Sequence, residues 1–511
     1  MTRKRTAANV RRGLFAALVA LAGCATPATP AAQPARDAAA APRPVVVISD
    51  FHMGLGRRAD AQWDPKEDFR WTGALRGFLD EVTRAHGEAV DLVIAGDFLE
   101  LWQPPADIPC VGNGADLGCT VAEMKEIVQR VVAAHSADAA ALAAFAGRGA
   151  NKVHVIPGNH DSALVIPEIW RIVADAMAAP GGRVALVADG VWTSADGKVL
   201  VEHGHQIGSD VNRYADWPTV TARQDGQAFV VRPWGELFVQ RLFNAEEEQY
   251  PIIDNLSPET AGARYRMADR GLWRSAGDVA RFVAFNVFET SARQKGAALG
   301  REPDAGVPCT RAEAEALGHR LVLGALDPKD PFRIQAEADT EEARQLRSAL
   351  DAQVKAMPDQ DLQDLCARQV DATTLGAAIE SKFVPRAEVI RKHLRERLAR
   401  HPDMTVFVYG HTHQLEEAWT LSVAKERAVT VLNSGAFQRL VDERGYLARV
   451  EALGIAPEEG LRRIALESLA PCYGAVVVRY DGGEPKAETR LWHMPEAGKG
   501  EFVSPGSRKC E

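Results

Sequence analysis

Short apolar runs that end in clusters of glycine and polar residues constrain the fold of this chain more than any other feature. This pattern occurs five times along the 511-residue sequence. Such runs are typical of strands buried on both faces, and α/β proteins place ligands at the carboxyl ends of these strands. The polar motifs are, in chain order, Asp50-Phe51-His52, Gly96-Asp97-Phe98-Leu99-Glu100, Gly158-Asn159-His160-Asp161, His203-Gly204-His205 and Gly410-His411-Thr412-His413. The sequence therefore predicts an α/β fold with one site assembled from several strand ends.

The residue types in these motifs are those that bind transition metals. Asp50 and His52 are two positions apart, so in an extended segment both side chains lie on one face and can reach the same cation. A carboxylate together with an imidazole suits Mn, Fe or Zn better than Ca, and Asn159 adds a neutral oxygen. Each motif alone is equally compatible with a polar turn after a strand, and it is the succession of five that favours a metal site.

The length of the chain exceeds one ordinary hydrophobic core, so we expect one large domain with an insertion, or two domains. The composition, 46% hydrophobic and 25% charged, is that of a globular protein. Strands and motifs occupy residues 44–209 and return at 400–495, whereas 210–399 has the spacing of helices and predicts a mostly helical insertion. Within the first part, Val121–Ala146 is predicted to be one long helix with His135 on its surface.

The N-terminus has the features of an export signal. Residues 1–23 begin with several arginines and contain a short apolar run that is too short to span a bilayer comfortably. The run ends in Leu21-Ala22-Gly23-Cys24, which resembles the signal box of bacterial lipoproteins; the resemblance implies cleavage before Cys24 and attachment of lipid to it. An ordinary secretory signal with an incidental cysteine is the alternative. Residues 24–43 are mostly Ala and Pro and predict an extended tether.

Six cysteines follow Cys24, and an even number in an exported protein predicts disulfides. None has Cys-x-x-Cys spacing, which argues against a thiolate zinc site or a redox motif. The last predicted pair would tie down a C-terminal tail at residues 496–511. Six cysteines allow fifteen connectivities, among which we favour Cys110 with Cys119, Cys309 with Cys366, and Cys472 with Cys510.

The five motifs, in this order, resemble those of the calcineurin-like metallophosphoesterase superfamily. The resemblance implies a four-layer α/β/β/α sandwich of two sheets, here with a large mostly helical insertion. It also implies two divalent or trivalent transition-metal ions, Mn, Fe or Zn, at the strand ends. Carried over by motif, the ligands of the first ion are Asp50, His52, Asp97 and His413, and those of the second are Asp97, Asn159, His203 and His411.

The resemblance further implies how the reaction proceeds. Asp97 would bridge the two ions, which lower the pKa of a shared water and hold the phosphoryl oxygens, so that a metal-bridging hydroxide attacks phosphorus. His160 would stabilise the phosphoryl oxygens or protonate the leaving oxygen, and Asp161 would hold the His160 imidazole in one tautomer.

Two positions depart from the patterns known in the superfamily. Glu100 replaces the usual aspartate of the second motif and is expected to contact ligands rather than a metal. His205 stands where some lipid-sugar pyrophosphohydrolases of the superfamily carry aspartate, and it is expected to line the pocket or approach the substrate. Arg57 and Arg58 are candidates for a phosphate contact, although a surface location is the commoner one for such arginines.

The sequence thus predicts a metal-dependent phosphoesterase acting on a phosphate mono- or diester, tethered by Cys24 to a membrane in the periplasm. Ala25, rather than aspartate, after that cysteine favours the outer membrane. The alternatives are a pyrophosphohydrolase or phospholipase acting on lipid headgroups, and a non-catalytic metal-binding lipoprotein. The net charge of -9 argues against nucleic acid as a partner.

Overall fold

The computed structural model describes most of the chain outside the N-terminal segment and the middle of the predicted insertion. The described residues are 42–108, 110, 115–208, 210, 212–257, 261–262, 265–266, 269, 344, 386–425, 427–495 and 499–510. The chain divides into two units, Met1–Ala40 and Ala41–Glu511, and all that follows concerns the second. The predicted signal segment, most of the tether and the cysteines at positions 24, 309 and 366 lie outside the described residues.

The larger of two main sheets contains the strands that precede the first three motifs. Its order is β17-β16-β15-β1-β2-β4-β5. β1, β2, β4 and β5 are parallel, so their carboxyl ends point the same way, whereas β15 is antiparallel to β1. The strands are β1 (Val45–Ile48), β2 (Asp91–Ala95), β4 (Lys152–Ile156), β5 (Val184–Leu186), β15 (Cys472–Asp481), β16 (Glu484–His493) and β17 (Glu501–Val503).

The smaller main sheet contains the strands that precede the last two motifs. Its order is β12-β13-β11-β7-β6, with β7, β11 and β13 parallel and the two edge strands antiparallel. The sequence separates β7 from β11 by the whole predicted insertion, yet the two strands are direct neighbours. The strands are β6 (Val191–Thr193), β7 (Val199–Glu202), β11 (Val406–Tyr409), β12 (Leu415–Ala424) and β13 (Arg427–Ser434).

The two sheets pack face to face, and alternation along each strand builds the cores on either side. Successive side chains of a strand point to opposite faces. In β1, Val45 and Val47 lie in the core between the sheets, whereas Val46 and Ile48 lie in the core beneath the helices. β7 repeats this pattern in the smaller sheet. The continuous apolar runs of the sequence are therefore strands that are buried on both faces.

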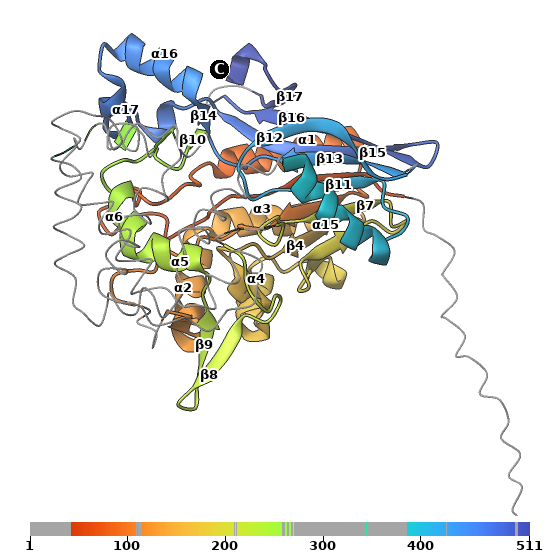
Figure 1. Ribbon diagram of the computed structural model, residues 1–511, viewed down its shortest axis with the longest axis horizontal. Helices are drawn as coiled ribbons and strands as arrows, with labels where there is room; N and C mark the ends of the chain where they lie inside the picture. The colour runs from red at the N-terminus through yellow and green to blue at the C-terminus, as the bar shows by residue number, and fades with distance from the viewer. Residues whose placement is uncertain are drawn as a thin grey trace, which may run out of the picture. The chain divides into compact units, whose positions relative to one another are not determined.

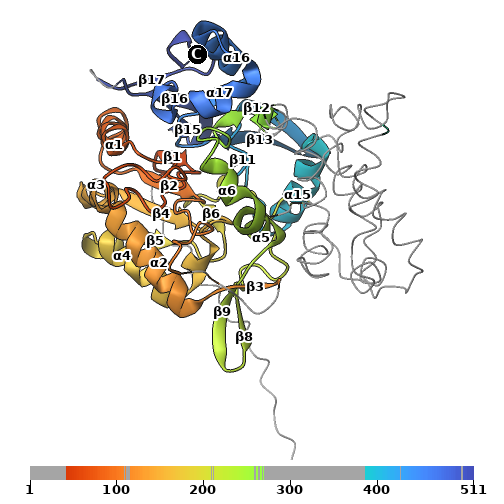
Figure 2. The ribbon, with the colours of Figure 1, turned by 90° about the vertical axis from the view of Figure 1, so that its left-hand side faces the viewer.

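Helices cover both outer faces of the sandwich (Figures 1 and 2). On the larger sheet lie α1 (Thr72–His86), α2 (Val121–Ala134), α3 (Ser136–Gly147) and α4 (Pro167–Ala176). On the smaller sheet lies α15 (Arg386–Arg400), whose Ile390 and Leu394 pack against Phe407 and neighbouring strand residues. The predicted four-layer α/β/β/α sandwich is confirmed. Because α15 covers a sheet face, the core of the fold begins before the predicted boundary at residue 399.

The described part of the predicted insertion is not purely helical. After β7 the chain forms a hairpin, β8 (Thr221–Gln224) and β9 (Gln227–Val231), which pairs with β3 (Leu117–Thr120) and projects from the body in Figure 1. A separate apolar cluster joins short segments to the C-terminal helices. The cluster includes residues of β10 (Leu256–Ser257), β14 (Val441–Asp442), α16 (Glu443–Leu453) and α17 (Pro457–Arg463), while the short helices α5 (Trp234–Phe238) and α6 (Asn244–Glu247) precede these elements in the chain.

Two local predictions can be compared with the structure. The predicted long helix is wrong: it breaks at His135, which ends α2 and precedes α3. His135 is buried there and does not lie on a helix surface. Its ring nitrogens find polar partners in the interior, at 3.0 Å from Asp138 Oδ2 and 3.3 Å from Glu67 Oε2. The disulfides Cys110–Cys119 and Cys472–Cys510 are present as predicted. Within the described residues, no helix is long and apolar enough to cross a membrane.

Candidate metal centre

All five polar motifs lie where a strand of one of the two sheets ends, and their backbones are tied together. The backbone N–H of Asp50, after β1, donates to Gly96 O, after β2, at 3.0 Å. The backbone N–H of His411, after β11 in the other sheet, donates to both oxygens of the Asp50 carboxylate at 3.1 and 3.2 Å. Motifs that are hundreds of residues apart in sequence therefore form one site at the edge of the sandwich.

The backbone at this site is strained. Five of the seven predicted metal ligands have a positive φ: Asp50 (55°), His52 (51°), Asp97 (48°), His411 (72°) and His413 (54°). Residues other than glycine rarely adopt this conformation, and when they do they cluster at functional sites. The surrounding fold therefore holds these side chains in orientations that an isolated segment would not choose.

The glycines of the motifs allow ligands from different strands to approach each other. A Cβ on Gly96 would lie 2.3 Å from His203 Nδ1, and a Cβ on Gly158 would lie 2.1 Å from Asp97 Oδ1. Any side chain at either position would collide with a predicted ligand from another strand. Gly96 and Gly158, which precede Asp97 and Asn159, are thus required by close packing within the site, and Gly96 in addition has a φ of 89°.

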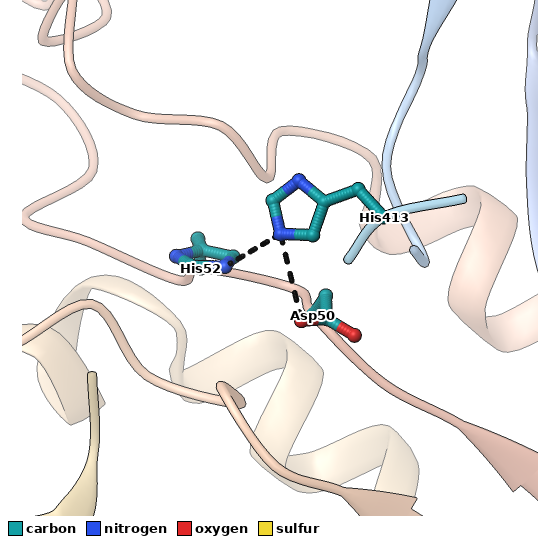
Figure 3. A group of neighbouring side chains, drawn as sticks. All are labelled: Asp50, His52 and His413. Atoms are coloured by element: carbon teal, nitrogen blue, oxygen red, sulfur yellow. Dashed lines mark hydrogen bonds and ion pairs between the residues drawn. The ribbon is translucent and has the colours of Figure 1, made fainter. Parts of the chain in front are cut away.

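The first group of converging donor atoms comes from Asp50, His52 and His413 (Figure 3). His413 Nε2 lies 3.2 Å from His52 Nε2 and 3.5 Å from Asp50 Oδ1. Asp97 Oδ2 is 3.8 Å from the same nitrogen of His52. The four residues predicted to bind the first ion therefore direct nitrogen and oxygen atoms toward one another.

The second group comes from Asp97, His203 and His411. His203 Nε2 lies 3.0 Å from Asp97 Oδ2 and 2.9 Å from Asn159 Oδ1. All four residues predicted for the second ion are thus assembled, and Asp97 belongs to both assemblies. That position is the one a bridging carboxylate would need.

The tautomer of His203 suits metal binding. His203 Nδ1 lies 2.8 Å from the carbonyl oxygen of Ala95, an acceptor only, so Nδ1 carries the proton. If His203 is neutral, its Nε2 then presents a lone pair to the oxygens of Asp97 and Asn159, and three acceptors face one another. A cation among them resolves this conflict, so the donor set fits a metal ion.

The charges of the site lead to the same conclusion. Burial alone would raise the pKa of the Asp97 carboxyl, but the imidazoles of His203 and His160 hold it well below its ordinary value. Burial would lower the pKa of His203, yet Asp97 raises it to about 9. Ionised carboxylates facing imidazoles favour additional positive charge, which either protons or metal ions can supply.

The structure corrects the expected partner of His160. His160 Nδ1 lies 2.5 Å from Glu100 Oε2, and its ring stacks on that of Trp102 at a centroid distance of 3.9 Å. Asp161 does not hold this imidazole. Its buried carboxylate accepts hydrogen bonds from the backbone N–H groups of Phe98, Leu99 and Gly158, and so joins two loops of the site. The prediction was wrong because adjacency in sequence does not give adjacency of side chains in a turn.

Glu100 contacts a predicted metal ligand, His52, as well as the predicted catalytic residue His160. The same Oε2 atom lies 3.0 Å from His52 Nδ1, and Oε1 accepts from the backbone N–H of Trp102 at 2.7 Å. This carboxylate fixes the proton of His52 on Nδ1 and leaves Nε2 for a cation. The expectation that Glu100 contacts ligands rather than a metal agrees with these contacts.

The remaining candidates of the sequence occupy different places. His205 is buried beside the rings of Trp217 and His203, with centroid distances of 4.6 and 5.4 Å, and neither of its ring nitrogens has a hydrogen-bond partner. It lines the site without belonging to the groups of converging donors. Arg57 stacks on Trp63 and donates to a backbone carbonyl, and Arg58 pairs with acidic side chains, so neither is directed at the predicted ligands.

Two residues that contact the site were missed by sequence reasoning. Asp210 Oδ2 lies 3.0 Å from His411 Nε2, but it stands just beyond the expected core boundary and belongs to no motif. Asn433 donates to Gly410 O at 3.1 Å and to Thr412 Oγ1 at 3.0 Å, and so holds the last motif. A signal for Asn433 existed, because it lies near the end of β13, whose sequence contains an apolar run.

Comparisons with known proteins agree with this site. Residues 43–283 match the family model described as calcineurin-like phosphoesterase, which covers four of the five motifs. No curated protein matches the chain significantly. Among solved structures the chain is similar to a dimetal phosphatase from Danio rerio, with 9% identity, coverage of 91% of this chain and 99% of that chain, and a TM-score of 0.30; so low a score supports no further conclusion. Residues 43–283 are thus similar to calcineurin-like phosphoesterases, and the four-layer sandwich and the assembled ligand set agree with that similarity.

Proposed function

We propose that this protein hydrolyses a phosphate mono- or diester with two transition-metal ions, Mn, Fe or Zn, held by the two donor groups described above. The observation that carries the proposal is the position of Asp97, whose Oδ2 lies 3.0 Å from His203 and 3.8 Å from His52. One carboxylate is thereby placed to contact both ions. Asp50, His52 and His413 complete the first group, and Asn159, His203 and His411 complete the second.

The residues of the site have two roles, binding the metal ions and orienting the side chains that bind them. Bound metal ions would supply Lewis acidity, lowering the pKa of water and stabilising charge on the phosphoryl oxygens. Neutral imidazoles and an amide oxygen bind such ions without cancelling their charge. Glu100 and the carbonyl of Ala95 orient His52 and His203, so that the ligand geometry is set before substrate binds.

His160 is placed to donate the proton that the leaving oxygen needs. Glu100 holds its Nδ1, so Nε2 is the nitrogen that can face substrate, and stacking on Trp102 fixes the ring plane. A histidine held by a buried carboxylate in this way can act as a general acid toward the leaving oxygen, which contributes roughly 10²- to 10⁴-fold in rate. We expect this help to matter most for alkoxide leaving groups, which are poor without a proton.

The function is tested by a panel of substrates and metals. Protein beginning at Ala25 is freed of metal, reloaded with Mn, Zn, Fe or Mg, and assayed on an aryl phosphomonoester, an aryl phosphodiester, a nucleotide-sugar pyrophosphate and a glycerophospholipid. Hydrolysis of one ester class that disappears in Asp97→Ala supports the proposal and identifies the class. Activity restricted to the pyrophosphate or the glycerophospholipid would support the alternative reactions instead. Two bound metals without hydrolysis of any substrate would favour a binding protein.

We further propose that the protein is a lipoprotein anchored on the periplasmic side of a membrane, most simply the outer membrane. The support is the sequence from Leu21 to Cys24 and the Ala/Pro-rich segment that follows it. The two disulfides fit an oxidising compartment. Fractionation of cells that produce the wild type and Cys24→Ser tests this. We expect the variant to lose lipid modification and membrane association; a variant that remained membrane-bound and processed as before would refute the proposal.

A further inference from the structure

Asp210 makes a contact with a predicted metal ligand that the family-derived ligand set does not include. Its Oδ2 lies 3.0 Å from His411 Nε2, and its Oδ1 accepts a hydrogen bond from the backbone N–H of Asn212 at 2.8 Å. The second contact fixes the orientation of the carboxylate. Asp210 follows β7 and His411 follows β11, so the pair also connects two strand-end loops of the smaller sheet.

Asp210 contacts His411 but is not among the converging donor atoms. The second donor group contains one atom each of Asp97, His203 and His411, all within 4.8 Å of one another, and Asp210 does not join this group. Its side chain is also more exposed than that of His411, 26% against 10%. These positions suit a carboxylate that contacts a ligand from the outside.

We propose that Asp210 is a positioning residue that accepts the Nε2–H of His411 and so directs the Nδ1 lone pair toward the second metal ion. This inference rests on the proposed role of His411 as a ligand. An imidazole that binds a metal through one nitrogen commonly donates its other N–H to a carboxylate, which fixes the ring and makes the ligand more basic. Asp210 would accept the ring N–H of His411 that does not face the metal. Glu100 does the same for His52, and the carbonyl oxygen of Ala95 does so for His203.

The inference predicts that the effect of Asp210 falls on one metal and not on the other. His411 belongs to the second donor group only, whereas Asp50, His52 and His413 form the first. Loss of the Asp210 carboxylate should therefore weaken the second equivalent of metal by about 10- to 100-fold and leave the first unchanged. Asparagine retains an oxygen that can accept the Nε2–H, so Asp210→Asn should keep most of the wild-type affinity.

Metal titration tests the inference without reference to activity. Full-length protein in detergent is freed of metal and titrated with Co²⁺, whose visible absorption reports coordination, and bound metal is counted after gel filtration. The series comprises the wild type, Asp210→Ala, Asp210→Asn and, as a matched removal of an exposed acid on β12, Glu417→Ala. We expect weaker binding of the second equivalent in Asp210→Ala alone.

Three results would overturn the inference. Asp210→Ala with wild-type affinity for both equivalents would show that the carboxylate does not position His411. Asp210→Asn as weak as Asp210→Ala, with a changed Co²⁺ spectrum, would show that the carboxylate is itself a ligand. Wild-type protein that binds only one equivalent would refute the two-metal proposal as well, so failure of the function and failure of the inference remain distinguishable.

Discussion

Replacement of Glu100 by glutamine is the change that most directly tests how this site transfers a proton. The Glu100 carboxylate has three partners: His160 Nδ1 at 2.5 Å, His52 Nδ1 at 3.0 Å and the backbone N–H of Trp102 at 2.7 Å. All three groups present a hydrogen. Glutamine has one acceptor oxygen and an NH₂ group that can only donate, so it cannot satisfy both ends of this arrangement.

The size of the effect follows from the contacts that are lost. A hydrogen bond to a charged group contributes about 1.5–3 kcal/mol, which corresponds to roughly 10- to 150-fold in rate if it acts on the transition state. Glu100→Gln should therefore lower kcat for an alkyl phosphoester by roughly this factor, because His160 loses the carboxylate that holds it. An aryl ester with a nitrophenolate leaving group needs no proton, so its kcat should fall far less.

The assay compares kcat for the alkyl and the aryl ester at saturating metal, so that weaker metal binding through His52 does not contribute. Asp161→Asn is the control, because the hydrogen bonds that Asp161 accepts from the described residues come from backbone N–H groups. We expect that variant to unfold at lower temperature and to keep the wild-type ratio of the two rates. Equal losses on both esters in Glu100→Gln would refute the assignment of His160, held by Glu100, as the proton donor.

Three further predictions follow from other parts of the structure. Asp97→Ala should lose metal, counted by elemental analysis, together with activity; full metal content with full activity would exclude a bridging role. His135, between two carboxylates, has its pKa raised to about 9, so it stabilises the fold below about pH 6.5 and this contribution is lost as the pH rises through 9. The unfolding free energy of wild type minus His135→Gln should accordingly shrink by about 3 kcal/mol between pH 6 and 10, and a constant difference would contradict the reasoning. The disulfide Cys472–Cys510 closes a loop of 38 residues, so Cys472→Ser should cost about 4 kcal/mol of stability in denaturant unfolding, and a cost near zero would show that the tail is held by other contacts.

The sequence alone determined the strands, the order of the motifs and the residue types of the site. A strand that is buried on both faces is apolar throughout, and in this fold the residues just after it are polar ligands. The apolar run and the polar motif can therefore both be recognised in the sequence. Glycines at positions such as Gly96 and Gly158 are visible too, because the close approach of another strand tolerates no side chain there. The four-layer sandwich came from the resemblance that these motifs carry, and the packing of α15 and the sheets confirms it.

Only the tertiary structure decided which side chain holds which. Asp161 follows His160 directly, yet its carboxylate turns to backbone N–H groups, while Glu100 from another strand holds the imidazole. Asp210 reaches His411 from a loop that carries no motif. The packing of the two sheets and their loops determines which side chains come into contact. Hydrogen bonds between distant segments leave no periodic pattern in a sequence. The ligands of this protein could be predicted because each of them follows an apolar run that is recognisable as a strand in the sequence. The residues that orient those ligands could not be predicted, because only the folded chain brings them together.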